Sequence, residues 1–302
     1  MGLFKPAVSR PEHHPVYRIM LPMERTGIPA LRTFGHTAGP EAGLPMIEHR
    51  HKDKFEFVLL IKGIQQHAVS GVSYTLYGGQ AFAVRPNEPH SCVQNCGEYS
   101  ELLWFQLDAF GPEGFLGLSG RDAQTLYDLL TGFSARQFEL SRRLIRLFLE
   151  AFELLSGLDY QMRMKGRALF LFCLLNLLES SAVVTALSDP IDKAKQYILR
   201  HIQEAIDMDE LLLASGLPMA EFREEFSAQI GMTPREFIQV QKVEASRPLV
   251  AAGMTPADVA YEFHFSSPSY FKLLFKRVMG MSMKQYYRKS QKEKEEKQLL
   301  VK

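Results

Sequence analysis

The chain has 302 residues, of which 46% are hydrophobic and 23% charged, and its formal net charge is +1. This composition excludes disordered, collagen-like and disulfide-scaffold proteins and favours a soluble protein of about two domains. The longest nearly apolar run, residues 168–178, is shorter than the ~20 residues that cross a membrane. Three cysteines and the absence of a visible export signal predict a cytoplasmic protein without a membrane partner.

Residues 1–45 are rich in Pro, His and Gly and show no sustained periodicity, so they predict an extended arm with one strand from Val16 to Leu21. Short apolar or alternating runs divided by turn residues follow, and they predict strands at Phe55–Ile61, Gln65–Val69, Val72–Leu76, Gln80–Val84 and Ser100–Leu107. This spacing is typical of an antiparallel sandwich or barrel, which we place at about residues 16–110.

The apolar period then changes to three and four residues, which is typical of packed amphipathic helices. These helices are predicted at Arg121–Leu130, Arg136–Leu155 and Gln161–Glu179. We expect this helical segment, about residues 121–187, to form the seam of a homodimer. The alternative is that the helices only cover the core of the barrel.

After a turn at residues 188–190 the sequence predicts helices with clear start signals. Thr233, Thr255 and Ser282 each begin a capping box, and Ser267 before Pro268 marks another helix start. Four residues recur 49 positions later: Phe222, Phe226, Gly231 and Phe237 correspond to Phe271, Phe275, Gly280 and Tyr286. The repeat predicts two tandem helix-turn-helix units over residues 190–290, followed by a charged tail at 291–302.

Residues 260–287 carry a specific pattern: Ala260, Phe265, Ser269, Tyr270, Phe271, Phe275, Lys276, Gly280 and Tyr286. With it, the chain resembles the AraC/XylS family of bacterial transcription regulators over almost its whole length. The resemblance implies an α+β protein, in which residues 1–187 hold the arm, a cupin-like ligand-binding barrel and a helical dimerisation segment. It also implies an all-α DNA-binding domain at residues 190–290.

A recognition helix needs exposed side chains near its start for bases, and cations for phosphates. In the second unit we assign base contacts to Pro268, Ser269, Lys272 and Leu273, and backbone contacts to Ser267, Lys276 and Arg277. Two departures from the family pattern occur here and in the linking helix. His264 replaces the usual turn glycine, and Pro248 is expected to kink or shorten the helix between the units.

The first unit is acidic, because residues 203–241 hold two basic and eight acidic residues, whereas residues 254–289 hold six basic and two acidic. Pro218 stands where a capping serine is expected. In its recognition helix we assign DNA contacts to Arg223 and Glu224, since a carboxylate can accept from cytosine. The alternative is an adaptor whose acidic first unit binds a protein instead of DNA.

Gly43, His49, His51, Glu56 and Gly63 reproduce the spacing of the first cupin motif, and His90 resembles the histidine of the second motif, with Glu88 in place of its glycine. The candidate metal ligands are therefore His49, His51, Glu56 and His90, for Zn, Ni, Mn or Fe. We expect His49 and His51 to share one strand face. The alternative is that these residues line a pocket without a metal, and no cofactor is required by the family. Cys92 and Cys96 follow closely and are weak evidence for a metal.

Polar and aromatic residues of the barrel are candidates for effector binding: Arg32, His51, His67, Glu56, Arg85, His90 and Trp104. Trp104 is the one tryptophan of the chain, and its ring suits stacking on a sugar. The alternative is that the ring belongs to the core of the barrel.

The sequence thus predicts a ligand-responsive regulator, not an enzyme, that binds double-stranded DNA as a homodimer and responds to a small-molecule effector, with RNA polymerase as a further partner. A metal-dependent cupin enzyme fused to a helical module is the alternative from another class, which the four-ligand spacing favours and the tandem repeat disfavours.

Overall fold

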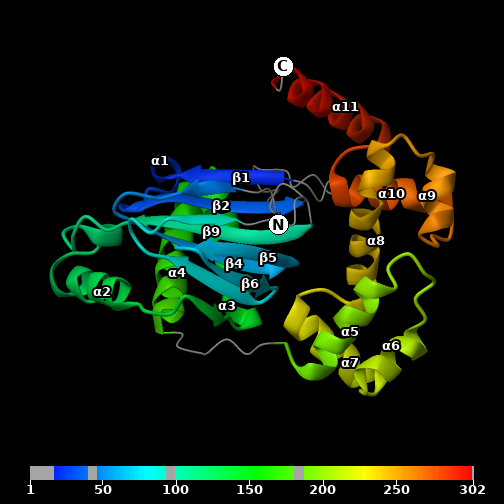
Figure 1. Ribbon diagram of the computed structural model, residues 1–302. Coiled ribbons are helices and arrows are strands. Elements are labelled where there is room, and N and C mark those ends of the chain that lie inside the picture. Colours follow the sequence, from blue (N-terminus) through cyan, green and yellow to red (C-terminus); the bar gives the residue numbers. More distant parts are fainter. Residues whose placement is uncertain (1–16, 40–45, 93–98, 180–186, 301–302) are drawn as a thin grey trace, which may run out of the picture.

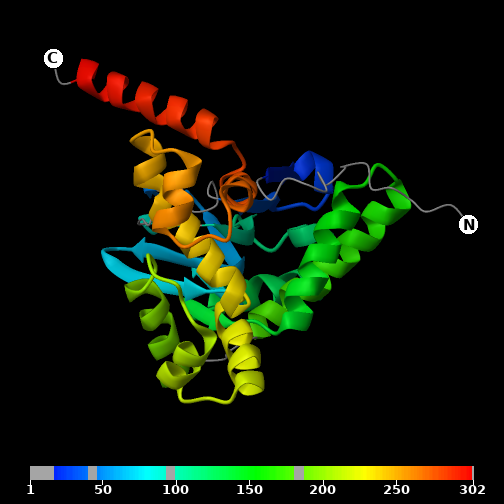
Figure 2. The same ribbon diagram turned by 90° about the vertical axis from the view of Figure 1, so that its right-hand side faces the viewer.

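The computed structural model describes residues 17–39, 46–92, 99–179 and 187–300. A β-rich half and a helical half lie next to each other, and one long helix, α8, runs between two lobes of the helical half (Figures 1 and 2). This mixed architecture confirms the expected α+β class, with antiparallel strands first and helices last.

The larger sheet has six strands, and every neighbouring pair is antiparallel. In order across the sheet they are β1 (Tyr17–Pro22), β2 (Leu31–Gly39), β9 (Ser100–Asp108), β4 (Lys54–Lys62), β7 (Gln80–Val84) and β10 (Gln137–Glu139). Strand β2 corrects the sequence prediction, which assigned residues 31–39 to an irregular arm. Its run from Phe34 to Gly39 is buried on both faces, so it lacks the alternation that identifies a half-exposed strand.

The smaller sheet has four strands in the order β3 (Met46–His49), β8 (His90–Cys92), β5 (Ile64–Val69) and β6 (Val72–Tyr77). It packs against one face of the larger sheet, because side chains of both sheets form one buried cluster: Val58, Leu60, Val69, Leu76, Phe82, Val84 and Leu102. The other face of the larger sheet packs on helices. Alternate residues of β4 separate these two cores: Val58 and Leu60 face the smaller sheet, while Phe57 and Leu59 belong to the helix-covered core.

The helices of this half are α1 (Met23–Thr26), α2 (Gly120–Gly132), α3 (Arg142–Ser156) and α4 (Tyr160–Glu179), with a 3₁₀ turn at Phe115–Gly117. Helices α3 and α4 lie against the larger sheet (Figure 1), and Phe148 and Phe170 contact Phe105 of β9 at ring-centroid distances of 5.7 and 5.4 Å. The predicted start of the second helix at Arg136 is wrong. Residues 137–139 pair with β7 as an edge strand, and Ser141 caps α3 by accepting from the Leu144 N–H.

The helical half contains α5 (Asp189–Arg200), α6 (Met208–Ser215), α7 (Met219–Ile230), α8 (Pro234–Ala251), α9 (Pro256–Glu262), α10 (Pro268–Met279) and α11 (Met283–Leu300). The repeated phenylalanines form its core: Phe222, Phe226, Phe271 and Phe275 are fully buried. None of the described helices is long and apolar enough to cross a membrane.

The predicted caps form. The hydroxyls of Thr233, Thr255, Ser267 and Ser282 each accept from the N–H three residues later, at 3.1–3.3 Å. His264 has a φ of +50°, as its position in place of a turn glycine suggested. Pro248 does not shorten α8 at its own position, because it lies in the last turn and the helix continues to Ala251.

The two halves are in direct backbone contact at two glycines. A Cβ on Gly78, in the turn after β6, would lie 2.6 Å from the Ile230 carbonyl oxygen, and one on Gly231, after α7, would lie 2.9 Å from the Gly78 Cα. Beside this contact, Lys195 Nζ donates to the Tyr77 hydroxyl at 3.1 Å. The first helix-turn-helix unit is thereby fixed to the edge of the smaller sheet.

Replacement of Gly35 by alanine is expected to lower the free energy of unfolding by about 1–3 kcal/mol, because the new Cβ would lie 2.3 Å from the indole of Trp104 on β9. Gly132→Ala is the matched control, since nothing lies within 4 Å of its added Cβ. Urea unfolding of both variants measures the difference. If Gly35→Ala and the parent chain are equally stable, the Trp104 side chain can move away from the added Cβ without a cost in free energy, and the prediction is wrong.

Candidate functional site

Helix α10 presents the residues that the sequence assigned to DNA. Pro268, Ser269, Lys272, Lys276 and Arg277 are exposed, and Ser267 is half-buried. The opposite face of the helix is buried in the core through its phenylalanines. A helix held on one side and cationic on the other has the arrangement needed to enter the major groove.

Helix α7 is the equivalent helix of the first unit, and its exposed face is acidic. Arg223 and Glu224 are exposed as predicted, together with Glu221 and Glu225. Its N-cap is Pro218, which offers no side-chain cap. Phosphate oxygens approaching this face meet three carboxylates and one guanidinium, so it attracts a DNA backbone less than α10 does.

Lys242 of α8 connects the two units, and sequence reasoning missed it. Its ammonium group is buried and donates to the Glu204 carbonyl at 2.8 Å in the first unit and to the Phe263 carbonyl at 2.7 Å in the second. Burial lowers the pKa of this lysine. The available signal was a lysine among the apolar residues of an otherwise buried helix face.

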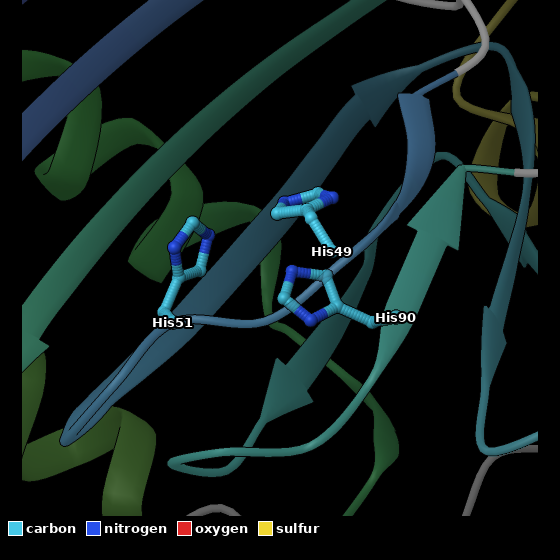
Figure 3. Close-up of side chains that lie close together, drawn as sticks. All are labelled: His49, His51 and His90. Carbon is cyan, nitrogen blue, oxygen red and sulfur yellow. The ribbon is translucent and has the colours of Figure 1, made fainter.

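In the β-rich half, His49, His51 and His90 come together (Figure 3). One ring nitrogen from each lies within 4.8 Å of the others, and the ring centroids are 4.2–5.1 Å apart. His49 ends β3 and is paired with His90 at the start of β8. The expectation that His49 and His51 share a strand face is wrong, because β3 ends at His49 and His51 lies in the following loop.

Glu56, the fourth predicted metal ligand, is not part of this close group. Its Oε2 lies 2.9 Å from His51 Nε2 and accepts from Gln106 Nε2 at 2.7 Å. Burial alone would raise the pKa of the Glu56 carboxyl, but the hydrogen bonds from His51 and Gln106 bring the pKa below its usual value. Glu56 is therefore a buried carboxylate in contact with His51, and Gln106 is a partner of both side chains that the motif spacing did not reveal.

His67 extends the polar part of the interior. It is buried, its Nε2 lies 3.1 Å from the Gln65 side-chain oxygen, and its ring stacks on Phe82 at 4.9 Å. Burial lowers the pKa of His67 to about 4. The imidazole is consequently neutral at physiological pH.

The remaining predicted effector residues have separate surroundings. Arg32 is exposed and its Nε lies 3.4 Å from Asp108, whereas Arg85 donates to the Ser134 carbonyl. Trp104 packs against the cluster between the sheets. The structure thus brings Glu56 to the histidine group and engages the two arginines elsewhere.

Glu88, which replaces the motif glycine, holds the loop before β8. Its carboxylate accepts from the backbone N–H of Arg85 at 2.7 Å and from both terminal nitrogens of Arg136 at 2.6–2.7 Å. Its carbonyl oxygen lies 3.0 Å from His90 Nδ1. The Glu88 side chain therefore holds the loop, and the backbone carbonyl of the same residue faces the His90 ring. Gly43 and Cys96 lie outside the described residues, and Cys92 is a buried thiol.

Comparisons with known proteins agree with both halves. Residues 34–172 match the model of the AraC-like ligand binding domain, and residues 211–289 match that of a helix-turn-helix domain. The chain is 24% identical over 243 residues to the probable transcriptional regulator LumQ of Photobacterium leiognathi, covering 79% of this chain and 91% of LumQ. It is 26% identical over 251 residues to the thermoregulatory protein LcrF of Yersinia pestis, covering 80% and 90%. A solved structure of ToxT from Vibrio cholerae, bound to a naphthalenyl butenoic acid, aligns with a TM-score of 0.32 at 13% identity over 85% of this chain and 99% of ToxT.

Acidification is expected to destabilise the chain partly through His67. Its pKa is about 4 in the folded chain, whereas a histidine in the unfolded chain has the ordinary value of 6.5. The unfolded chain therefore binds the extra proton, and stability falls as the pH drops from 6.5 toward 4. Between pH 7 and pH 4.5, His67→Gln should lose about 2 kcal/mol less unfolding free energy than the parent chain. Urea unfolding at both pH values measures this, and identical losses would contradict a depressed pKa.

Proposed function

This chain belongs to the AraC family of ligand-responsive transcription regulators, and we propose that α10 reads the major groove of duplex DNA while the polar residues around Glu56 bind a small effector. The exposed cationic face of α10 is the observation that carries the DNA contact. We also propose that the chain acts by binding rather than by turnover, in the cytoplasm, where its DNA target lies.

The start of α10 supplies the groups for base recognition. Ser269, Lys272 and Leu273 are exposed within its first two turns, where a recognition helix meets base edges. Lysine donates to guanine O6 and N7, and an apolar side chain such as Leu273 suits the thymine methyl group. Lys276, one turn later, is positioned for phosphate. The preferred site should therefore contain guanine and thymine where this helix binds.

The first unit contributes less affinity in this proposal. Glu224 accepts from cytosine N4 and Arg223 meets the backbone, while Glu221 and Glu225 oppose phosphates. Lys242 of α8 donates to both units. In this proposal α7 and α10 therefore bind the same face of the duplex, about one turn of DNA apart.

Effector binding is coupled to DNA binding through the glycine contact between the halves. Gly78 follows β6, which belongs to the smaller sheet. Its contact with Gly231 restrains the end of α7, and the ion pair of Lys62 with Glu236 at 3.5 Å lies on the same side. We place the effector on Trp104 and the polar groups around Glu56, which suits a hydroxylated molecule such as a sugar. A change in the smaller sheet then alters the freedom of the first unit.

Helix α4 supplies the surface for a homodimer in this proposal. Met164, Ala168 and Phe172 recur every four residues and are exposed, and Phe172 keeps 49% of its surface accessible. An isologous contact through this stripe would double the number of DNA-reading units. RNA polymerase is a further partner of the DNA-bound dimer.

Lys272→Ala should weaken binding to a selected DNA site by roughly 5- to 150-fold, because a base contact is lost. The site is obtained by selecting bound fragments from random DNA with the full chain, and affinity is measured against salt concentration. Arg121→Ala, at the exposed start of α2, is the control that removes the same charge outside the helical half and outside the proposed dimer surface. A uniform loss across sequences would reassign Lys272 to phosphate, and no enrichment of any DNA in the selection would favour the adaptor alternative.

Gly78→Val should raise the affinity of the full chain for a selected two-patch site, by roughly fivefold or more, because the side chain forces the two halves apart and releases the first unit. Gly132→Val, where nothing lies within 4 Å, is the control. Fluorescence anisotropy with labelled duplex gives both affinities. An unchanged or lower affinity would remove this contact from the coupling mechanism.

A further inference from the structure

We propose that His49, His51 and His90 bind one divalent transition-metal ion of the Zn²⁺ type through three imidazole nitrogens, with Glu56 and Glu88 as positioning residues rather than ligands. The three rings point toward one another from β3, the loop after it and β8 (Figure 3). This site goes beyond the proposed regulatory function and does not depend on DNA binding.

In each ring, one nitrogen already faces an oxygen acceptor. His49 Nδ1 lies 2.9 Å from the Ile47 carbonyl oxygen, and His90 Nδ1 lies 3.0 Å from that of Glu88. A carbonyl oxygen only accepts, so the proton of each neutral ring is assigned to Nδ1, and the lone pair is at Nε2.

The same assignment holds for His51 with the nitrogens exchanged. Its Nε2 lies 2.9 Å from the Glu56 carboxylate, which accepts the ring proton and leaves the lone pair at Nδ1. The Gln106 amide group lies 3.1 Å from the same Nε2 and donates to Glu56. Metal-binding histidines characteristically have this second partner, which fixes the tautomer and the ring orientation.

His90 supplies a separate indication. Among the described residues its Nε2 is buried and has no hydrogen-bond partner, in a side chain that is only 4% exposed. A buried lone pair without a partner costs free energy, because the same nitrogen accepts a hydrogen bond from water in the unfolded chain. A metal ion held between the three rings would satisfy this nitrogen.

The dimensions and donor types indicate the class of ion. Ligand nitrogens about 2.1 Å from a tetrahedral ion are about 3.4 Å apart, so the nitrogens within 4.8 Å of one another need only small ring rotations to close on it. Imidazole donors suit Zn, Cu, Fe and Ni, whereas Mg and Ca prefer oxygen. Three protein ligands leave a further coordination position for water or for a donor atom of the effector.

Titration of the tag-free full chain with Co²⁺, the spectroscopic probe for such a site, tests the proposal. We expect visible absorption bands that saturate at one ion per chain and disappear on addition of one equivalent of Zn²⁺. His90→Gln and His49→Gln should each lower the affinity at least about tenfold. His201→Gln, which changes a half-buried histidine of the helical half, is the control and should leave the titration unchanged.

Glu56→Gln separates a positioning role from ligation. A positioning role predicts unchanged band positions with a roughly 10- to 100-fold weaker affinity. A shift of the bands would make Glu56 a ligand and overturn this part of the proposal. Urea unfolding of each apo variant identifies any that fail to fold.

His13 and His14, which are consecutive in the sequence, are another source of imidazoles. Replacing both by glutamine should leave one bound ion per chain. If this double variant loses the absorption bands, or if His49→Gln and His90→Gln keep them at full affinity, the three-histidine site is excluded.

Discussion

The alternation of side chains along β4 and β9 is the constraint on which the β-rich half depends. Odd positions of β4, such as Phe57 and Leu59, enter the core beneath α3 and α4, while even positions, such as Glu56 and Val58, face the smaller sheet. A shift of one residue would place Glu56 among phenylalanines, where the carboxylate would lose its His51 and Gln106 partners. Register therefore fixes both the core and the polar part of the interior.

The helical half is organised around α8 in a comparable way. The helix carries the first unit at one end and the second at the other, and the buried ammonium of Lys242 joins carbonyl oxygens of both. This leaves α7 and α10 on a common support, and the first unit contacts the β-rich half at Gly78. In the proposed mechanism the two units have different tasks: the cationic face of α10 binds DNA, and α7 is the helix that a change in the smaller sheet reaches first.

The histidine group shows how a motif and a structure assign different roles to the same residues. The spacing of His49, His51, Glu56 and His90 suggests four equivalent ligands, whereas the geometry makes Glu56 a partner of His51. Glu88 stands in place of the motif glycine. Its carboxylate pairs with Arg136, and this pair fixes the loop that carries His90. The pair of Glu88 and Arg136 joins residues 48 positions apart in the chain, so it leaves no local spacing to recognise.

The sequence alone determined what local physics controls. Capping hydroxyls at Thr233 and Thr255, and the 49-residue repeat of phenylalanines, located the helices and the two units because caps and periodic burial act within a few residues. Short apolar or alternating runs bounded by turn residues found β4, β7 and β9, but this signal failed for β2, whose buried positions include Gly35, His36 and Thr37. Helical periodicity wrongly included the edge strand β10. The tertiary structure alone decided that Lys242 links the units, that Glu56 contacts His51 and that Gly78 contacts Gly231. Each of these contacts joins segments at least five residues apart whose approach depends on sheet register and helix packing, which no local pattern records.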